Sequence, residues 1–398
     1  MLSAESRPGA LTPVPDQPLK TTILDPAHRA LKARMVAFAG YDMPVQYEMG
    51  VLKEHLWTRE HAGAFDVSHM GPCFLDLATS GGDPEERHQA VASLIEPLVS
   101  GDIAGLKPGK LRYTLLLNED GGILDDLMIG RPSDPKFQGR LYIVVNAGTK
   151  EADLELIAQA AGRAARLSRA DDGGLIAVQG PDAADVVGKL FPQSRSLSFM
   201  TFERMPMEKR TVRVSRSGYT GEDGFELLAP TTAADDLWQR LLQDDRVRPI
   251  GLGARDSLRL EAGLPLYGHD LDPTVSPVEA GLAFAVSKKR LKAGAVRGAE
   301  RIRAELDGGA TRVRVGLKVL EGAPAREGAQ IVEAGWAHLG QVTSGGFSPS
   351  LGYPIAMGFV PPAWSAPGTQ LTVEVRGRGQ AAEVVALPFV PHRYRRPA

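Results

Sequence analysis

One stretch, residues 121–129 with the sequence GGILDDLMI, restricts the fold more than any other part of the chain. Two glycines turn the chain into an apolar run that carries two adjacent acids, Asp125 and Asp126. In a β-strand, successive side chains point to opposite faces, so only one of these acids can enter a given pocket. Because the run is apolar on both faces, we expect the strand to be covered on both sides.

An acid in such a strand has two interpretations. A carboxylate that loses water without a compensating partner is destabilising, so its presence indicates a functional site. A carboxylate that accepts backbone N–H groups at a strand end beside a glycine turn is instead structural. This stretch alone favours neither interpretation.

Length and composition exclude several classes of protein. A chain of 398 residues exceeds what one hydrophobic core usually supports, so we expect two or three domains. A net charge of -2 argues against a nucleic-acid partner, and no apolar run is long enough to cross a membrane. The single cysteine, Cys73, excludes an intrachain disulfide, and the eight histidines lack paired metal spacing, so we expect no metal site.

Residues 1–20 are predicted to be a disordered extension. They are rich in proline and poor in apolar residues, and they contain neither a signal-peptide core nor an arginine-rich amphipathic helix. The lone cysteine also fits a reducing compartment, so we expect a cytoplasmic location.

The rest of the chain predicts a mixed α+β fold, because strand-like and helix-like patterns follow one another. Helices are expected over residues 21–33, with Asp25 as N-cap, and over residues 51–61, 151–167 and 250–260. Strands are expected over residues 65–71, 111–117, 121–129 and 141–145, and a hairpin over residues 212–230.

A basic segment, residues 288–303, predicts a surface linker helix and a domain boundary. It separates a module at residues 21–288 from a C-terminal domain at residues 289–398. Short runs between glycines and prolines predict a small β-barrel or sandwich in the second part.

Several polar residues are candidates for a site, and each also has a structural interpretation. His69 is either a base or a histidine bonded to backbone. Glu226, within a returning strand, reaches solvent or meets a ligand donor. Arg255 near a helix N-terminus is informative because cations are disfavoured there, although it can pair with Asp256. Asn146 at a strand end is a turn residue or offers its amide to a heterocycle.

Common cofactor motifs are missing. GLGARD lacks the spacing of a dinucleotide fingerprint, no GxxxxGK[ST] loop is present, and SGG at residues 344–346 is not a GxSxG elbow. The residues alone therefore indicate an α+β protein with buried acids and do not name a substrate.

Eight motifs occur in a fixed order between residues 35 and 394: MVAFAGYDMPVQY, FDVSHMG, GGILDDLMI, SGYTGEDGFE, ARDSLRLEAGLPLYGHD, PVEAGLAF, VTSGGFSPSLG and PFVPHRY. Together they resemble the T-protein family of the glycine cleavage system, the tetrahydrofolate-dependent aminomethyltransferases. The resemblance implies a three-domain cloverleaf around a folate channel, with two interwoven α+β subdomains at residues 21–288 and a C-terminal β-barrel.

The resemblance also implies roles for single residues. Asp126 is similar in position to the family's catalytic aspartate. Folate contacts are implied for Glu226, Arg255 and Tyr394, and channel-lining positions for Met70, Tyr113 and Asn146. One departure is Phe284, where relatives often carry tryptophan, so the stacking area there is reduced.

The implied reaction accounts for these residue types. A lipoyl-bound aminomethyl group, carried on the H-protein, is transferred to tetrahydrofolate with release of ammonia. A carboxylate such as Glu226 can accept two pterin N–H groups, and Arg255 can bind an oxygen of the folate tail or hold Glu226. Asp126 can handle a proton and stabilise a passing iminium cation.

Two other functions of related proteins remain open. A folate-dependent demethylase of the same fold would take a methyl group from a sulfonium or amine. A folate-binding accessory protein of iron–sulfur assembly would catalyse no transfer, but such proteins carry a cysteine motif, and Cys73 lies in no such context. For docking of the lipoylated H-protein we predict the basic residues Lys288, Lys289, Arg290 and Lys292.

Overall fold

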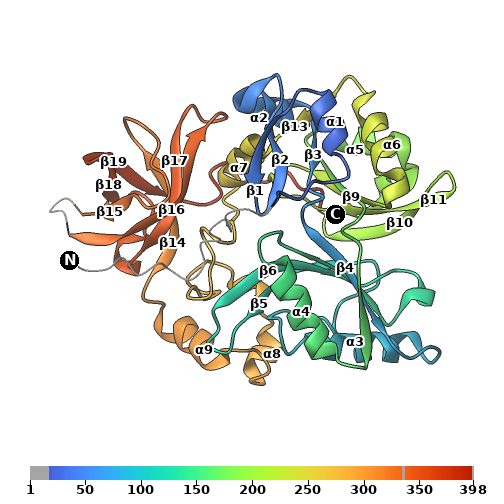
Figure 1. Ribbon diagram of the computed structural model, residues 1–398. Coiled ribbons are helices and arrows are strands. Elements are labelled where there is room, and N and C mark those ends of the chain that lie inside the picture. Colours follow the sequence, from blue (N-terminus) through green and yellow to red (C-terminus); the bar gives the residue numbers. More distant parts are fainter. Residues whose placement is uncertain (1–17, 334–336, 397–398) are drawn as a thin grey trace.

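The protein consists of two α+β units and a β-barrel that meet near the centre of the molecule, as the computed structural model shows (Figure 1). The structure describes residues 18–333 and 337–396. The predicted extension at residues 1–20 therefore lies mostly outside the described residues; Lys20, which is described, forms a β-bridge with Tyr41. The expected mixed α+β fold with a C-terminal barrel is confirmed.

The first unit is built on a six-stranded sheet with the order β10-β11-β12-β9-β3-β13. Its core surrounds the fully buried Trp238. Its strands are β3 (Ala62–Asp66), β9 (Gly174–Gln179), β10 (Thr201–Met207), β11 (Arg210–Arg216), β12 (Gly224–Ala229) and β13 (Val247–Ile250). Its helices are α1 (Asp25–Ala30), α2 (Gly50–Glu60), α5 (Ala183–Leu190), α6 (Thr231–Leu242) and α7 (Leu252–Glu261), and a two-stranded sheet of β1 (Arg34–Phe38) and β2 (Tyr41–Gln46) lies beside them.

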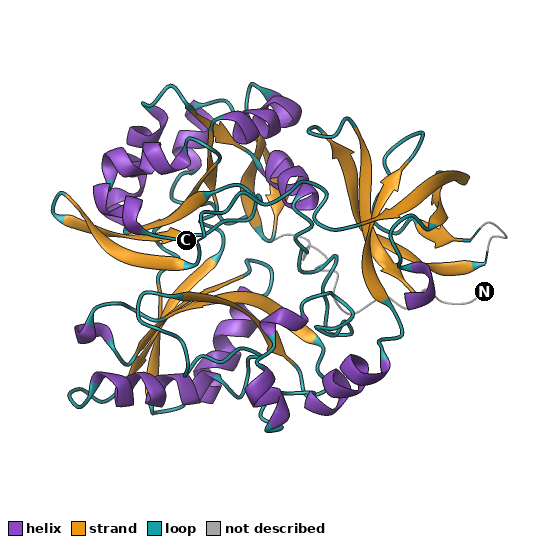
Figure 2. Cartoon of the chain, turned by 180° about the vertical axis from the view of Figure 1, so that it is seen from behind, coloured by secondary structure: helices purple, strands orange, loops and turns teal. Residues whose placement is uncertain are grey.

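The second unit is a five-stranded sheet with the order β5-β6-β7-β4-β8. Its strands are β4 (Gly71–Leu77), β5 (Leu111–Leu117), β6 (Ile123–Gly130), β7 (Arg140–Val145) and β8 (Ala165–Arg169). Helices α3 (Pro84–Ile95) and α4 (Lys150–Ala161) share a core with the sheet. In the view from behind, helices lie on the outer sides of the two sheets, and the sheets face each other across the middle (Figure 2).

The two units are interwoven as expected, because the chain leaves the first sheet after β3, builds the whole second sheet, and returns at β9. The prediction of one strand over residues 65–71 is wrong. Asp66 ends β3 by accepting a hydrogen bond from the backbone N–H of Ser68 at 2.9 Å, which bends the chain. His69 and Met70 therefore lie in a crossing segment between the sheets.

Strand β6 carries the two acids as the alternation predicted. Asp125 lies on the same face as the buried Leu127, whereas Asp126 lies on the other face and is partly exposed. Gly122 ahead of the strand is required by packing, because a Cβ there would come within 1.8 Å of the Pro273 carbonyl oxygen. The glycine turn thus fixes where the acid strand begins.

Some helix boundaries differ from the prediction. In α1 the N-cap is Leu24, and Asp25 instead accepts a hydrogen bond from Arg29. The helix predicted over residues 151–167 ends at Ala161, because Gly162 adopts a positive φ of 52° and the chain then forms β8.

The barrel is closed by six strands in the order β14-β17-β16-β15-β18-β19. They are β14 (Val313–Val319), β15 (Gln330–Val332), β16 (His338–Ser348), β17 (Tyr353–Val360), β18 (Gln370–Val375) and β19 (Arg378–Val385). Before the barrel, the chain forms two helices, α8 (Lys288–Lys292) and α9 (Ala299–Gly308), instead of one linker helix. Gly294 and Gly298, both with positive φ, separate them. The boundary at residues 288/289 remains a prediction.

Arg290 is not the surface residue that the basic run suggested. It is only 7% exposed, and its guanidinium donates to the carbonyl oxygens of Val99 at 2.7 Å and Gly101 at 2.6 Å. Lys288, Lys289 and Lys292 are exposed. Arg290 therefore holds α8 against the second unit. Within the described ranges, no helix is long and apolar enough to span a membrane.

Candidate active site

Asp126 is held by side chains from the strands on either side of β6. The Tyr113 hydroxyl, from β5, donates to Asp126 Oδ2 at 3.0 Å, and Asn146 Nδ2, just after β7, donates to Oδ1 at 2.8 Å. Asp125, on the other face, accepts the backbone N–H of Asn146 at 3.0 Å. Asp125 therefore fits the structural interpretation of an acid in this strand, because it accepts a backbone N–H group. Asp126 fits the interpretation of a functional site, because only uncharged side chains hold it.

The surroundings of Asp126 disfavour its ionised form. Burial, followed by the negative charge of Asp125, raises the pKa of Asp126 to about 7, although the donors Tyr113 and Asn146 act in the opposite direction. No lysine or arginine forms a salt bridge with Asp126 in the described part of the chain. A carboxyl with a pKa near neutrality can both accept and return a proton.

Phe284 marks the open side of this group. Its ring stacks on Tyr113 with centroids 6.1 Å apart and an interplanar angle of 22°, yet 74% of Phe284 is exposed. A large exposed aromatic residue one contact away from Asp126 is typical of the rim of a binding site.

A second group contains Glu226 and Arg255. Glu226 on β12 accepts the Ser217 hydroxyl at 2.6 Å. Burial lowers the pKa of Arg255, and the charge of Glu226 partly offsets this effect. Arg255 does not pair with Asp256, which binds Arg259 at 2.8 Å. Arg255 Nη1 is buried and has no hydrogen-bond partner among the described residues, so a donor is left for a ligand.

Tyr219 connects the two groups, and the sequence reasoning missed it. The Arg255 guanidinium lies 5.0 Å from the centre of the Tyr219 ring. Burial raises the pKa of Tyr219, and the nearby charge of Asp126 adds to this effect. Arg314 on β14 joins the barrel to the loop after α7, because its Nη1 donates to the Gly263 carbonyl at 3.0 Å, and the Tyr219 hydroxyl donates to the Pro265 carbonyl of the same loop. An aromatic residue inside the glycine-rich loop SGYTGEDG was the available signal for Tyr219.

The remaining candidates lie at different distances from this centre. Met70 is partly buried and packs against the core between the sheets, and its carbonyl accepts a hydrogen bond from Lys150 Nζ at 3.2 Å. Tyr394 stacks on Phe199 with centroids 4.1 Å apart, and no contact joins it to Asp126 in the described ranges. The structure therefore brings Asp126, Tyr113 and Asn146 directly together, whereas Tyr394 packs on Phe199 beside the loop that contains Tyr219.

His69 matches neither interpretation. Its Nδ1 is buried without a hydrogen-bond partner among the described residues, so it is not bonded to backbone through that atom. Burial lowers the pKa of His69 to about 3, so it is a weak base at neutral pH. The ring packs edge-on against Phe38 and Tyr41.

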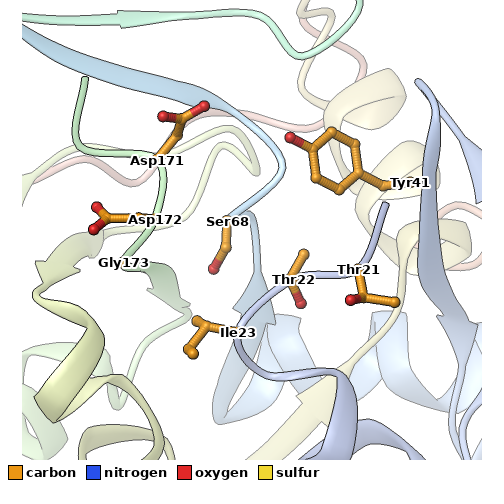
Figure 3. A pocket seen from close by; sticks show the side chains of 8 residues that line it. All are labelled: Thr21, Thr22, Ile23, Tyr41, Ser68, Asp171, Asp172 and Gly173. Carbon is orange, nitrogen blue, oxygen red and sulfur yellow. The ribbon is translucent and has the colours of Figure 1, made fainter. Parts of the chain in front are cut away.

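A cavity of about 310 Å³ lies beside this crossing segment, with Ser68 in its lining (Figure 3). Lys150 separates it from Met70, because its Nζ contacts the cavity residues Tyr41 at 2.7 Å and Asp171 at 3.1 Å as well as the Met70 carbonyl. None of the predicted site residues lines it. The lining residues are Thr21, Thr22, Ile23, Tyr41, Ser68, Asp171, Asp172 and Gly173.

Family models cover both parts of the chain. The GCVT N-terminal domain matches residues 24–290, and the glycine cleavage T-protein C-terminal barrel domain matches residues 312–391. This pair of domains defines the class of protein. The chain belongs to the glycine cleavage T-protein family, as the order of its motifs predicted.

Individual relatives agree with this assignment. "Aminomethyltransferase, mitochondrial" of Homo sapiens is 44% identical over 384 residues, which cover 94% of this chain and 91% of that protein. The protein of the same name from Gallus gallus is 44% identical over 388 residues, with 94% of each chain covered. The crystal structure of glycine cleavage system aminomethyltransferase T from Bartonella henselae has a TM-score of 0.87 and 40% identity, with 95% of this chain and 100% of that chain covered. The predicted enzyme class, aminomethyltransferase, is confirmed.

Proposed function

We propose that this aminomethyltransferase transfers the aminomethyl group of a lipoylated H-protein to tetrahydrofolate, with Asp126 as the catalytic carboxylate. One observation carries the assignment of Asp126: it is the carboxyl that two uncharged donors hold in place while burial and Asp125 raise its pKa to about 7. Such a group can take up the proton released as a C–N bond forms. Its negative form also stabilises a cation beside it.

Glu226 and Arg255 fit tetrahydrofolate. Glu226 provides carboxylate oxygens for neighbouring pterin N–H donors, and Arg255 Nη1 is a buried donor without a protein partner in the described ranges. When bound, tetrahydrofolate supplies the nitrogens that receive the one-carbon unit as ammonia leaves. The protein's part is to orient that cofactor, to keep Asp126 in reach of the reacting nitrogen and to manage its proton.

The H-protein is proposed to dock on three of the four predicted basic residues, because Arg290 is buried. Lys288, Lys289 and Lys292 are exposed on α8, close in the chain to the exposed Phe284. An acidic carrier would be steered to these charges. Lys289→Glu with Lys292→Glu should slow turnover with the H-protein a few-fold at low salt, less at high salt, and not with free aminomethylated lipoamide. Equal slowing with both substrates would contradict docking at α8.

The activity is tested by measuring ammonia and methylenetetrahydrofolate from aminomethylated H-protein, with and without tetrahydrofolate. We expect release that depends on tetrahydrofolate and that falls in Asp126→Asn. The alternative, a folate-dependent demethylase, predicts faster one-carbon transfer from a methylated amine or sulfonium than from the lipoyl substrate. That result would overturn the proposed substrate.

The location of the protein remains a prediction. The cytoplasmic location expected from the sequence gains no support from the relatives, which are named mitochondrial. Cell fractionation of the full chain with a C-terminal tag tests it.

A further inference from the structure

His69 is the one buried histidine in the described part of the chain whose ring nitrogens make no hydrogen bond. Three other histidines are buried, and each has a partner: a carboxylate for His28 and His55, and a backbone carbonyl for His88. His69 is 3% exposed, and its Nδ1 is buried without a partner among the described residues. Such an atom is destabilising unless something binds to it, so it points to a ligand.

Hydrogen bonds on both sides of His69 fix its backbone in the crossing segment. The backbone N–H of Met70 donates to the Val67 carbonyl at 3.0 Å, which closes a turn around Ser68 and His69. The Ser68 hydroxyl accepts the backbone N–H of Leu175 at 3.0 Å, which ties the turn to β9. The segment therefore presents His69 in one position.

The ring of His69 is held by packing alone. It lies edge-on against Phe38 of β1 and Tyr41 of β2, with centroids 5.6 Å and 6.3 Å apart. The Tyr41 hydroxyl accepts Lys150 Nζ at 2.7 Å instead of binding the imidazole. The hairpin of β1 and β2 thus orients the ring and leaves Nδ1 to a ligand.

His69 lies at the end of the first sheet where Arg255 also lies. Strands β3 and β13 are parallel and paired, with Phe65 opposite Ile250, so the chain leaves both strands at the same edge. The segment after β3 contains His69, and the segment after β13 starts α7 with Arg255 in its first turn. The carboxyl ends of parallel strands are a common place for ligands.

Glu226 faces the same region. On β12 it lies opposite Ala177 of β9, which in turn lies opposite Phe65 of β3. Paired residues project from the same face of a sheet, so Glu226 shares its face with Phe65. In the strand order β12-β9-β3-β13, the strand that leads to His69 lies between the strand that carries Glu226 and the strand that leads to Arg255.

The imidazole of His69 suits a neutral polar group. Burial lowers its pKa to about 3; the charge of Asp66 opposes this effect, and the charges of Arg255 and Lys150 add to it. A neutral imidazole donates from one ring nitrogen and accepts at the other, whereas a carboxylate is better matched by a permanent cation such as Arg255. In tetrahydrofolate, the reduced pterin ring carries the neutral polar groups and the tail carries the carboxylates.

We propose that His69 is a further cofactor-binding residue of the folate site, and that its Nδ1 forms a hydrogen bond with the reduced pterin ring of tetrahydrofolate. This inference rests on the proposed function. His69 orients the ring, and Asp126 manages the proton.

The test compares His69→Leu with His69→Asn by isothermal titration calorimetry with tetrahydrofolate. Leucine removes both ring nitrogens, so the affinity should fall about 3- to 10-fold, the loss expected for one neutral hydrogen bond. The amide of asparagine can place a polar atom near the position of Nδ1, so the affinity should stay within about 2-fold of the wild type. Unchanged affinity in His69→Leu, or equal losses in the two variants, would overturn the proposal.

Urea denaturation without ligand separates a ligand-binding role from a structural one. His69→Leu removes a polar atom without a partner, so the free energy of unfolding should stay or rise. His88→Leu is the matched control: His88 is buried on α3 and its Nδ1 also lacks a partner among the described residues, but its Nε2 donates to the Ile103 carbonyl at 3.0 Å. This variant should lose stability and keep its affinity for tetrahydrofolate. Equal losses of stability in the two leucine variants would assign His69 a structural role and overturn the proposal.

A tetrahydropterin without the tail, 6-methyltetrahydropterin, locates the contact. His69→Leu should weaken the binding of this compound and of tetrahydrofolate by the same factor, because both contain the ring. A loss confined to tetrahydrofolate would place His69 at the tail and overturn the assignment to the ring. If the wild-type protein binds neither compound, the proposed function fails; if the wild type binds both and His69→Leu binds them equally well, only the role of His69 fails.

Discussion

Asp126 and Glu261 are two carboxyls at the centre of the molecule, the first partly exposed and the second buried, and they differ in what surrounds them. Glu261, the last residue of α7, is 0% exposed and accepts hydrogen bonds from His55, Arg59, Ser348 and Ser350. Burial alone would raise its pKa, but His55, Ser348 and the charge of Arg59 lower the pKa of Glu261 to about 2. Asp126 has two uncharged donors and an acid as its neighbour, and its pKa rises.

The comparison shows that burial does not decide the protonation of an acid, because the number and charge of its donors do. Glu261 stays ionised and joins α2 and α7 of the first unit to β16 of the barrel through Arg59 and Ser348. Asp126 is left without a cation and can exchange a proton. The two carboxyls thus differ in the charge of their partners as well as in their exposure.

The largest effect is expected when Glu261 loses its charge. Glu261→Gln leaves Arg59 and His55 buried beside an amide, so the free energy of unfolding should fall by about 3 to 5 kcal/mol, measured by urea denaturation. Glu327→Gln is the matched control, because Glu327 pairs with His269 at the surface and should change stability by less than about 1 kcal/mol. Equal losses in both variants would show that the donors around Glu261 do not matter.

Asp126→Asn should act on turnover instead of folding. The amide keeps the shape of the carboxyl but cannot accept a proton or balance a cation, so kcat should fall by about 100-fold or more. Steady-state assays with aminomethylated H-protein measure this, and tetrahydrofolate binding should remain. Asp120→Asn should keep normal turnover; a comparable loss there would remove the distinction between Asp126 and an ordinary surface acid.

Glu226→Gln should weaken tetrahydrofolate binding by about 1 to 3 kcal/mol, since an amide presents one donor where two acceptors are needed. Isothermal titration calorimetry measures the change. Glu203→Gln, on β10 of the same sheet, serves as a control without a proposed ligand role. Unchanged affinity in Glu226→Gln would remove Glu226 from the folate site.

The same comparison predicts opposite effects of pH on stability. The folded-state pKa of Asp126 lies above its unfolded value of about 4, so this group lowers stability as pH rises from about 4 to 7. Asp126→Asn should therefore raise the free energy of unfolding by about 1 to 3 kcal/mol near pH 8 and change little near pH 4. Glu261 has a depressed pKa, so its contribution is present above about pH 4 and is lost as pH falls towards 2. A stability gain in Asp126→Asn that was equal at both pH values would contradict the account.

The sequence predicted what depends on local patterns. Alternation along residues 123–129 placed Asp125 and Asp126 on opposite faces, and the glycine-rich loop placed Glu226 in a returning strand. The sequence did not predict hydrogen-bond partners that come from distant segments of the chain. Ser348 binds Glu261 across 87 residues, and no local periodicity encodes that contact.

Two further misses have physical causes. The break between β3 and β4 came from a hydrogen bond within Asp66–Ser68, which competes with strand pairing but leaves the apolar alternation intact. Tyr219 was not identified as a site residue, because it lies among turn-forming residues in the loop SGYTGEDG.

The central claim is that the donors around each acid set its ionisation. It is tested most directly by following the carboxyl carbons of Asp126 and Glu261 by nuclear magnetic resonance during a pH titration, with assignments from Asp126→Asn and Glu261→Gln. We predict a midpoint of about 7 for Asp126, and a Glu261 signal that stays ionised down to the acid limit of folding. A midpoint of about 4 for Asp126, the value of an exposed aspartate, would contradict the account.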